Sequence, residues 1–444
     1  MLGWEILKIG ERKLKIKRMS SEEEELIKKI ESVYGEKTKI KSIMNNEEAE
    51  ESIKQIMSAE CEKEGLTLDY DQERYMLENA VKHIFGFGPL EELMDNDEIE
   101  EISIIGIGKP IYIFERNRGW MRTNVAFNDE EFFKEFVNKI IKKIGRTITL
   151  KKPRVNGVMP NGSRVHATAP PISQCELTIR KFRMNPYTPK ELVSKSAISL
   201  YGMAFLSLIM QSDSNVIISG NTASGKTTTM NSLFTFIPKN ERVLLIEETP
   251  EINILHEHQI RLVTNENMKI SLSDLVHDSL RMRPDRTVIG EVRKPDEIEA
   301  MVDIMLSGQA RGSYCTMHGR SFDETVQRLK SLGCSESETK SVDLILVQKR
   351  RLVYDRKKRK NREIREIVEI GSPRYAEYFK ANENEIKSSD TVLEIADKLG
   401  FSKKEMFEEI KTREKIISKS DNDFIDYFEN VQKSLYGFEK DDRL

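Results

Sequence analysis

Cysteine is scarce in this chain of 444 residues: the only four stand at positions 61, 175, 315 and 334, and no two form a C-x-x-C pair. This spacing excludes a four-cysteine zinc site, and isolated thiols suit a reducing compartment. Aromatic residues are also few, at 7% of the chain, which counts against a surface built to stack nucleic-acid bases. We therefore expect a cytoplasmic protein that forms no stable complex with nucleic acid.

Long apolar runs are lacking as well. The longest apolar segment, 197–210, is interrupted by Ser199, Gly202 and Ser207. It is shorter than the roughly 20 residues that span a bilayer, and it is typical of a buried helix. Residues 1–5 lack the apolar region of a signal peptide. Any association with a membrane is therefore expected to come through a partner.

Neither sign of charge dominates, because 71 Lys and Arg residues oppose 74 Asp and Glu residues, for a formal net charge of -3. That balance argues against a protein whose whole surface coats nucleic acid, so basic stretches are judged locally. Most of the local positive charge lies in 349–351 and in 355–362, the tip of an expected hairpin between 352–354 and 364–370. A solvated turn is favoured there over a docking site for lipid head groups or for an acidic partner.

Composition and periodicity change along the chain and divide it into segments. Residues 12–65 are dense in Lys and Glu, with apolar residues at helical spacing that predict solvated, weakly packed helices. Pro186 and Pro189 mark a linker. The expected segments are 1–70, a charged helical N-terminal extension; 71–185, a smaller α+β domain; 186–190, the linker; 191–373, an α/β core; and 374–444, a helical C-terminal region.

Apolar strands alternate with helices in the expected core. Alternation of this kind predicts a mostly parallel sheet, which binds its ligands at the carboxyl ends of the strands. The expected strands are 216–219, 243–246, 287–289, 313–316 and 344–347.

The most informative motif is Gly-x-x-x-x-Gly-Lys-Thr at 220–227, directly after the first of these strands. Gly220 and Gly225 permit backbone angles that turn successive N–H groups toward phosphate oxygens. Lys226 neutralises the β- and γ-phosphates, Thr227 offers its hydroxyl to Mg²⁺, and the helix that begins there points its positive end at the anion. The motif predicts a nucleoside triphosphatase. The expected nucleotide-binding residues are Gly220, Asn221, Thr222, Ala223, Ser224, Gly225, Lys226, Thr227 and Thr228.

Motifs downstream of this loop follow the order used by the type II/IV secretion and type IV pilus assembly ATPases, and the chain resembles the archaeal branch of that family. Residues 280–293 are similar to the Walker B block of the family, with Gly290 in place of the usual first acid and Glu291 retained. A carboxylate at the end of a buried strand beside the γ-phosphate can orient and deprotonate the attacking water. Glu291 is therefore the expected catalytic base. The resemblance implies a RecA-like P-loop NTPase core that uses ATP and Mg²⁺.

A pair of acids follows the second expected strand. Residues 245–251 resemble the Asp box of the family, in which paired acids, here Glu247 and Glu248, reach Mg²⁺ through water. The resemblance implies that both acids serve catalysis and that Glu248, together with Thr227, holds the metal. The family often has Asp where this chain has Glu248.

A histidine follows the fourth expected strand. Residues 313–318 resemble the His box of the family, which implies that His318 contacts or senses the γ-phosphate. Relatives commonly carry a second histidine where Gln309 stands in this chain.

Segments upstream of the loop agree with the resemblance. Residues 85–93, 160–165 and 178–182 are similar to the opening and arginine-bearing segments of the family. In hexamers of this family the N-terminal domain supplies arginines to a nucleotide, which implies catalytic roles for Arg164 and Arg180. A forked, permanently charged guanidinium stabilises charge that is spread over phosphoryl oxygens.

The resemblance implies a hexameric motor that couples ATP hydrolysis to assembly of pilin-like filaments or to secretion. Its implied partners are further copies of the chain, a polytopic membrane platform protein and, indirectly, pilin-like subunits. The motor would then lie at the inner face of the cell membrane through that platform protein. Two other functions stay open: a RecA-like nucleic-acid translocase, and a nucleotide-gated structural subunit that turns ATP over too slowly to do work.

Overall fold

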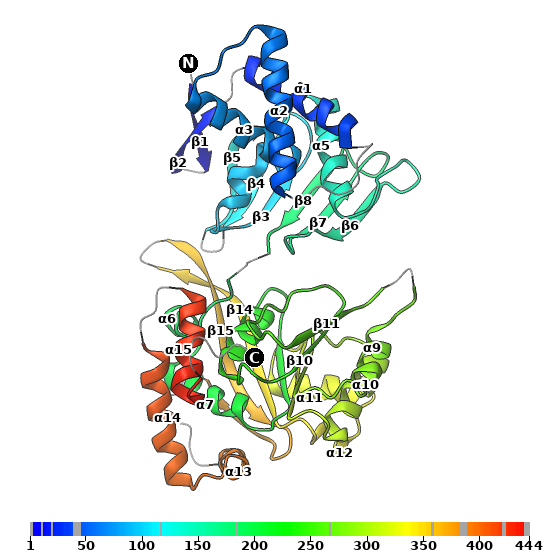
Figure 1. The fold of residues 1–444 in the computed structure, drawn as a ribbon. Coiled ribbons are helices and arrows are strands. Elements are labelled where there is room, and N and C mark those ends of the chain that lie inside the picture. The colour runs from blue at the N-terminus through cyan, green and yellow to red at the C-terminus, as the bar shows by residue number, and fades with distance from the viewer. Residues whose placement is uncertain are drawn as a thin grey trace. The chain divides into compact units, whose positions relative to one another are not determined.

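A computed structural model gives the fold in two compact units, Met1–Phe182 and Arg183–Leu444, which are described separately as the first and second unit. Each unit contains one eight-stranded sheet (Figure 1). The structure describes residues 3–9, 12–18, 21–38, 46–115, 118–182, 185–265, 268–356, 359–381, 389–419 and 423–438.

The first unit begins with a hairpin and three helices. Strands β1 and β2 pair with each other, and β1 joins β5 of the larger sheet through Ile9 and Thr123. The helices bury a shared apolar cluster that includes Ile27, Ile53 and Met76. These elements are β1 Gly3–Ile9, β2 Arg12–Arg18, α1 Ser21–Thr38, α2 Asn46–Glu64 and α3 Tyr70–Ile84.

Two expectations for residues 12–65 are therefore wrong. Arg12–Arg18 is a strand and not a helix, because Leu14 and Ile16 alternate with basic residues at the period of two that suits a strand. The helices α1 and α2 are also well packed rather than weakly packed, since Ile30 and Ile53 are fully buried.

The sheet of the first unit runs in the order β2-β1-β5-β4-β3-β8-β7-β6, and every neighbouring pair is antiparallel. The apolar stripe of α5, which includes Phe133 and Ile140, packs in one cluster with Ile102 and Leu177 of the sheet. The remaining elements of this unit are η1 Gly88–Leu90, α4 Glu91–Asp95, β3 Ile99–Ile104, β4 Pro110–Glu115, β5 Gly119–Ala126, α5 Glu130–Lys143, β6 Arg154–Val158, β7 Arg164–Thr168 and β8 Glu176–Arg180.

The sheet of the second unit runs in the order β11-β10-β12-β13-β9-β14-β15-β16. In this order, the strands from β11 through β14 run parallel to their neighbours. Strand β15 pairs antiparallel with β14, and β16 pairs antiparallel with β15. The five strands expected from the sequence are confirmed. They are β9 Val216–Gly220, β10 Val243–Glu247, β12 Arg286–Ile289, β13 Gly312–Met317 and β14 Leu344–Asp355, and the others are β11 Gln259–Val263, β15 Lys360–Ser372 and β16 Glu377–Lys380.

Helices cover both faces of this sheet. On β9, Ile218 packs in a cluster with α7, α14 and α15, whereas its neighbour Ile217 packs in a cluster with α9, α10 and α11 on the other face. Strands buried on both faces read as continuous apolar runs, which is why the sequence revealed them. The helical elements are α6 Pro189–Ser194, α7 Leu200–Gln211, α8 Lys226–Leu233, η2 Phe234–Phe236, α9 Leu272–Ser279, α10 Pro295–Ser307, α11 Phe322–Ser331, α12 Glu336–Thr339, α13 Asp390–Lys398, α14 Lys403–Ile417 and α15 Phe424–Tyr436.

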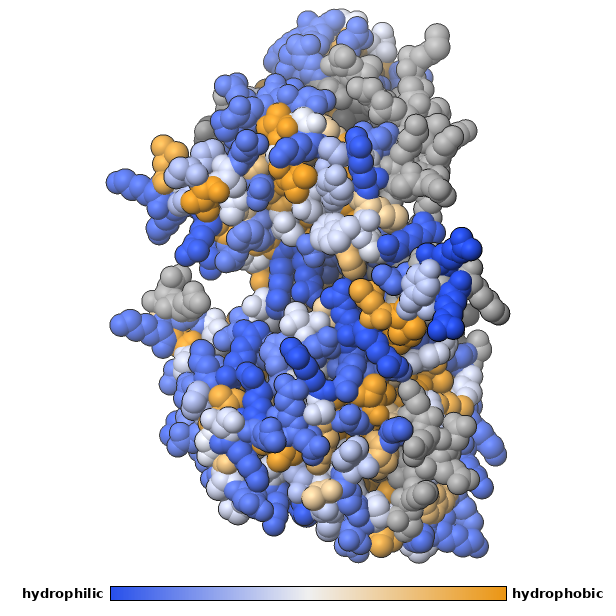
Figure 2. Space-filling view, turned by 180° about the vertical axis from the view of Figure 1, so that it is seen from behind, coloured by the Kyte–Doolittle hydropathy of each residue, from blue (hydrophilic) through white to orange (hydrophobic). Residues whose placement is uncertain are grey.

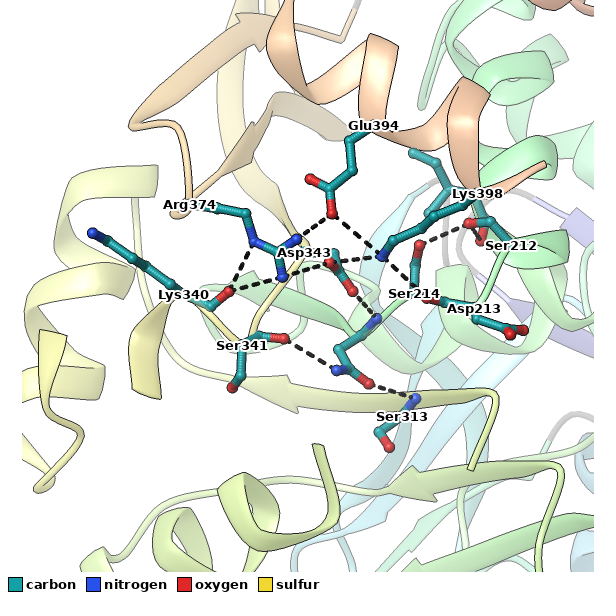
Figure 3. Close-up of polar contacts among 12 residues, drawn as sticks. Ser212, Asp213, Ser214, Ser313, Lys340, Ser341, Asp343, Arg374, Glu394 and Lys398 are labelled. Carbon is teal, nitrogen blue, oxygen red and sulfur yellow. Dashed lines mark hydrogen bonds and ion pairs between the residues drawn. The ribbon is translucent and has the colours of Figure 1, made fainter. Parts of the chain in front are cut away.

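A polar cluster ties α13 to the amino edge of the sheet, the edge opposite the phosphate-binding motif (Figure 3). Asp343 lies 2.8 Å from Lys398 Nζ and 3.2 Å from Arg374 Nη2. The other carboxylate oxygen of Asp343 accepts a 2.7 Å hydrogen bond from the backbone N–H of Asn215, the residue before β9. The helical C-terminal region is thus fixed at the base of the strand that carries the motif.

Hydrophilic residues cover most of the face drawn in Figure 2, and hydrophobic residues form small separate groups on it. Within the described ranges, none of the helices has both the length and the apolar character needed to cross a bilayer.

Candidate functional site

The glycine-rich loop joins β9 to α8, which begins at Lys226. Gly225 has a φ of +98°, a conformation that favours glycine. A Cβ added to Gly220 would lie 2.3 Å from the backbone oxygen of Gln348. The two glycines of the motif are therefore required, one by its backbone angle and the other by close packing against β14.

Strand β14 holds this loop through two further contacts. The Asn221 side chain exchanges hydrogen bonds with the backbone of Arg350, at 3.1 Å and 2.9 Å. The buried Gln348 side chain accepts a 2.9 Å hydrogen bond from the Thr229 hydroxyl on α8. Sequence reasoning missed Gln348, and its only local signal is a polar residue directly after the apolar run 344–347.

Lys226 is nearly buried, and its Nζ lies 3.4 Å from the backbone oxygen of Gly220 and 3.7 Å from Glu291 Oε1. Burial lowers the pKa of Lys226, and the nearby charges of Glu291 and Glu251 oppose that effect. Because burial penalises the charged form of a lysine, a further anion beside the ammonium group stabilises that form. The loop thus presents a charge suited to phosphate.

Glu291 follows β12 and lies among three basic side chains. Its Oε1 is 2.9 Å from His318 Nε2, and its Oε2 accepts hydrogen bonds from Arg293, at 3.0 Å from Nε and also from Nη2. Burial raises the pKa of Glu291, but the Arg293 hydrogen bonds and the Lys226 charge outweigh burial, so this pKa lies below its ordinary value. The structure thus brings Glu291, His318 and Lys226 together.

The two acids that end and follow β10 have different surroundings. Glu247 is 1% exposed, and its Oε1 accepts the backbone N–H groups of Glu251 and Ile252 at 2.7 Å and 2.8 Å. Burial raises the pKa of Glu247 against these hydrogen bonds. Glu247 therefore shapes the following loop, whereas the exposed carboxylate of Glu248 lies 3.0 Å from Arg293 Nη1.

Thr227 donates a 2.9 Å hydrogen bond from its hydroxyl to Glu251 Oε2. Within the described part of the chain, Glu251 is thus the acid that the structure places against the expected metal-binding hydroxyl. Sequence reasoning did not single out Glu251, although it is the third acid in the five residues after the strand core. The backbone N–H of Glu251 donates to Glu247, so Glu247 helps to hold Glu251 beside Thr227.

Arg164 and Arg180 lie on neighbouring strands of the first unit. Their Cα atoms are direct cross-strand partners on β7 and β8, and Arg180 also faces Glu101 on β3. The Arg180 side chain is exposed and that of Arg164 is half-buried. The structure brings the two arginines together, in a different unit from the loop residues.

The residues of the loop fit a magnesium nucleotide. The Ser224 hydroxyl is buried and finds no hydrogen-bond partner among the described residues, which suits a loop that surrounds an additional polar group. Thr227, Glu248 and Glu251 offer hard oxygen ligands of the kind that Mg²⁺ prefers.

A phosphate loop on a central strand, with acids at the carboxyl ends of β10 and β12, defines a RecA-like P-loop NTPase fold, as the sequence predicted. The family described as type II/IV secretion system protein matches residues 85–422, which is more than half of the chain. The chain therefore belongs to this family, which confirms the family expected from its motifs.

Several proteins are similar to this chain. An uncharacterized protein of Methanocaldococcus jannaschii is 35% identical over 219 residues, which cover 46% of this chain and 30% of the relative. A second protein of that organism is 30% identical over 255 residues, covering 56% of this chain and 46% of the relative. The match thus spans less than half of either relative. The type IV secretion system protein VirB11 of Brucella suis is 25% identical over 316 residues, covering 62% of this chain and 85% of that protein.

Solved structures of similar chains include an ATPase and a pilus retraction motor. The Legionella pneumophila ATPase DotB has a TM-score of 0.46 at 20% identity and covers 74% of this chain and 86% of its own. The pilus retraction motor PilT with bound ADP has a TM-score of 0.49 at 16% identity and covers 75% of this chain and 91% of its own.

Proposed function

We propose that the chain is an ATPase that hydrolyses ATP at the edge of the sheet where β9, β10, β12 and β13 end. The observation that carries this proposal is the approach of Glu291 to Lys226, because it sets a carboxylate beside the lysine of a phosphate loop. Such a pair suits phosphoryl transfer, in which catalysis consists of positioning and of electrostatic stabilisation.

Each group of the site has a role in this mechanism. The loop amides and Lys226 bind the triphosphate and neutralise its charge. Glu291 orients the attacking water and accepts its proton, and its lowered pKa keeps it ionised at neutral pH. His318, whose Nε2 lies 2.9 Å from Glu291 Oε1, is proposed to position this carboxylate. Thr227, with Glu248 and Glu251, would hold Mg²⁺, which when bound supplies charge neutralisation at the phosphates.

Arg164 and Arg180 are proposed to complete the site. Two adjacent guanidinium groups on a rigid sheet can deliver positive charge to the phosphoryl oxygens of a bound nucleotide. In a homo-oligomer, expected here to be a hexamer, the nucleotide served by these arginines can belong to another copy of the chain. Turnover would then depend on assembly.

Membership of the secretion family supports a mechanical role for this hydrolysis. We propose that the ATPase drives the assembly of pilin-like filaments, or secretion, through a polytopic membrane platform protein, and that it resides in the cytoplasm at the inner face of the membrane by binding that protein. The similarity to two proteins of Methanocaldococcus jannaschii supports the archaeal branch of the family.

The alternative of a nucleic-acid translocase depends on the basic hairpin β14–β15. Three of its basic residues have acidic partners within the hairpin: Lys349 with Glu369, Arg350 with Glu363, and Arg351 with Glu366. This pairing reduces the charge available to phosphates and favours the filament or secretion motor. At the tip, Lys357 and Lys358 lie outside the described residues. Steeply salt-dependent DNA binding and DNA-stimulated hydrolysis would favour the translocase instead.

The experiment that tests the proposed function compares the full chain with Glu291→Gln. Loss of a general base predicts that steady-state ATP hydrolysis falls about 100- to 10,000-fold, while ATP affinity measured by calorimetry stays within threefold. Turnover should be measured with membranes that contain the platform protein, which separates a working motor from a slow nucleotide-gated subunit. Equal turnover by both proteins would contradict the proposed mechanism.

A further inference from the structure

One guanidinium bridges two acids of the site that come from different strands. Arg293 Nε and Nη2 donate to Glu291 Oε2, and Nη1 donates to Glu248 Oε2 at 3.0 Å. The backbone N–H of Arg293 donates at 2.7 Å to Glu297 Oε2 at the start of α10. Arg293 thus has a fixed backbone and a side chain that spans the ends of β10 and β12.

The bridge concerns residues on which metal binding is proposed to depend. Glu248 is a candidate metal ligand, and its carboxylate is 37% exposed, while the Arg293 side chain is 49% exposed. A contact between two exposed, flexible side chains is readily exchanged for another partner, because its net strength in water is small. Glu291 is less exposed, at 21%, and is held from several sides. The Glu248 half of the bridge is therefore the half that can open.

We propose that Arg293 is a positioning residue that competes with the divalent cation for Glu248 while it continues to orient Glu291. Arg293 would thereby set how strongly nucleotide affinity depends on metal. This inference rests on the proposed function. It follows because the guanidinium and Mg²⁺ are both cations that bind the same carboxylate. The guanidinium must leave Glu248 before that oxygen can approach Mg²⁺.

The inference predicts effects of opposite sign in the presence and absence of metal. Without Arg293, a positive charge near the triphosphate is lost and two acids are left uncompensated, so metal-free ATP binds more weakly. The cation, however, no longer competes for Glu248. The ratio of the ATP dissociation constant in EDTA to that in Mg²⁺ should therefore increase.

The test is calorimetric titration of the full chain with ATP, in EDTA and in Mg²⁺. For Arg293→Gln we expect this ratio to rise about tenfold over that of the unsubstituted protein, which corresponds to about 1.4 kcal/mol of added coupling. Arg293→Lys keeps the charge but loses the fork that spans both acids, so an intermediate ratio is expected. The matched control is Lys294→Gln, which removes the neighbouring charge from a side chain that is 61% exposed and paired with Glu297; its ratio should stay within twofold.

A double-mutant cycle assigns the effect to Glu248. In a Glu248→Gln background, Arg293→Gln should still weaken the binding of metal-free ATP, because Glu291 loses its guanidinium partner, but it should no longer strengthen the binding of ATP in Mg²⁺, so the ratio should rise by less than in the single variant. An unchanged ratio in the single variant, or an increase of equal size in the Glu248→Gln background, would overturn the inference. Failure of the unsubstituted protein to bind ATP in either medium would instead overturn the proposed function on which it rests.

Discussion

The two units each contain a sheet of eight strands, but the sheets differ in strand direction. In the second unit the strands from β11 to β14 in sheet order are parallel, so their carboxyl ends meet at one edge and bring together Lys226, Glu291 and His318. In the first unit all pairings are antiparallel, and the candidate residues Arg164 and Arg180 are cross-strand neighbours within the sheet. Shared strand direction thus gathers the candidate site residues at one edge, whereas alternating direction sets the candidate arginines side by side within the sheet.

The first prediction concerns what the antiparallel sheet contributes. Because an arginine that reaches a transferred phosphoryl group is worth roughly 1,000-fold or more in turnover, Arg180→Ala and Arg164→Ala should each reduce ATP hydrolysis by about that factor. ATP affinity should change much less. The matched control is Arg154→Ala on the adjacent strand β6, where the side chain is also exposed. If Arg180→Ala and Arg164→Ala hydrolysed ATP as fast as the control variant, the arginines of the first unit would have no role in catalysis.

The second prediction concerns the parallel edge. Lys226→Ala removes a charge-assisted contact worth about 3 kcal/mol, which corresponds to a roughly 100-fold loss of ATP affinity. Calorimetric titration with ATP measures this directly. Lys330→Ala, on the exposed surface of α11 beside Glu336, is the control and should bind ATP normally. If Lys226→Ala retained full affinity, the loop would not be the phosphate site.

The third prediction concerns the packing between β9 and β14. Gly220→Ala places a Cβ 2.3 Å from the backbone oxygen of Gln348, and overpacking of this kind costs about 1 to 3 kcal/mol. We expect the loop to shift and the ATP affinity to fall about tenfold. Gly35→Ala in α1 is the control, because its added Cβ meets nothing within 4 Å. Wild-type affinity in Gly220→Ala would show that the loop tolerates displacement.

The fourth prediction concerns the stability of the second unit instead of its affinity for ATP or its turnover. His256 is 1% exposed and packs edge-on against Phe234 and Phe428, and burial lowers the pKa of His256 from 6.5 to about 4. The unfolded chain binds a proton below pH 6.5 that the folded chain does not bind until about pH 4. Stability should therefore fall by up to about 3 kcal/mol as the pH drops through this window.

Thermal unfolding between pH 4 and 6.5 measures this effect. In His256→Phe the contribution of this residue should disappear, so the melting temperature should depend less on pH in that window. His166→Phe, at an exposed position of the first unit, is the control. An equal pH dependence in His256→Phe and in the unsubstituted protein would contradict the assignment.

Local patterns were enough to predict the core of the second unit. Val216, Val243 and Leu344 open apolar runs whose length and spacing identify strands, and the glycine-rich motif locates the loop between β9 and α8. Prediction fails at Arg12–Arg18, a strand that stands directly before the charged helices α1 and α2. The alternation of apolar and basic residues there covers only seven residues, and the dense charge of the surrounding sequence makes it hard to recognise.

Parts of the site were beyond prediction for a different reason. Glu251 contacts Thr227 across 24 residues of chain, and Gln348 contacts Thr229 across 119 residues. Contacts of this separation depend on tertiary packing and leave no periodic trace in the sequence. The same holds for Arg293, whose bridge to Glu248 spans 45 residues.

The measurement that tests the central claim most directly is a crystal structure of the full chain with Mg²⁺ and a slowly hydrolysed ATP analogue. We predict that the triphosphate lies on the backbone amides of 220–227, with Lys226 on its phosphates and the Glu291 carboxylate facing the terminal phosphate. A loop that stays empty at millimolar analogue, or a Glu291 side chain that faces away from that phosphate, would contradict the account.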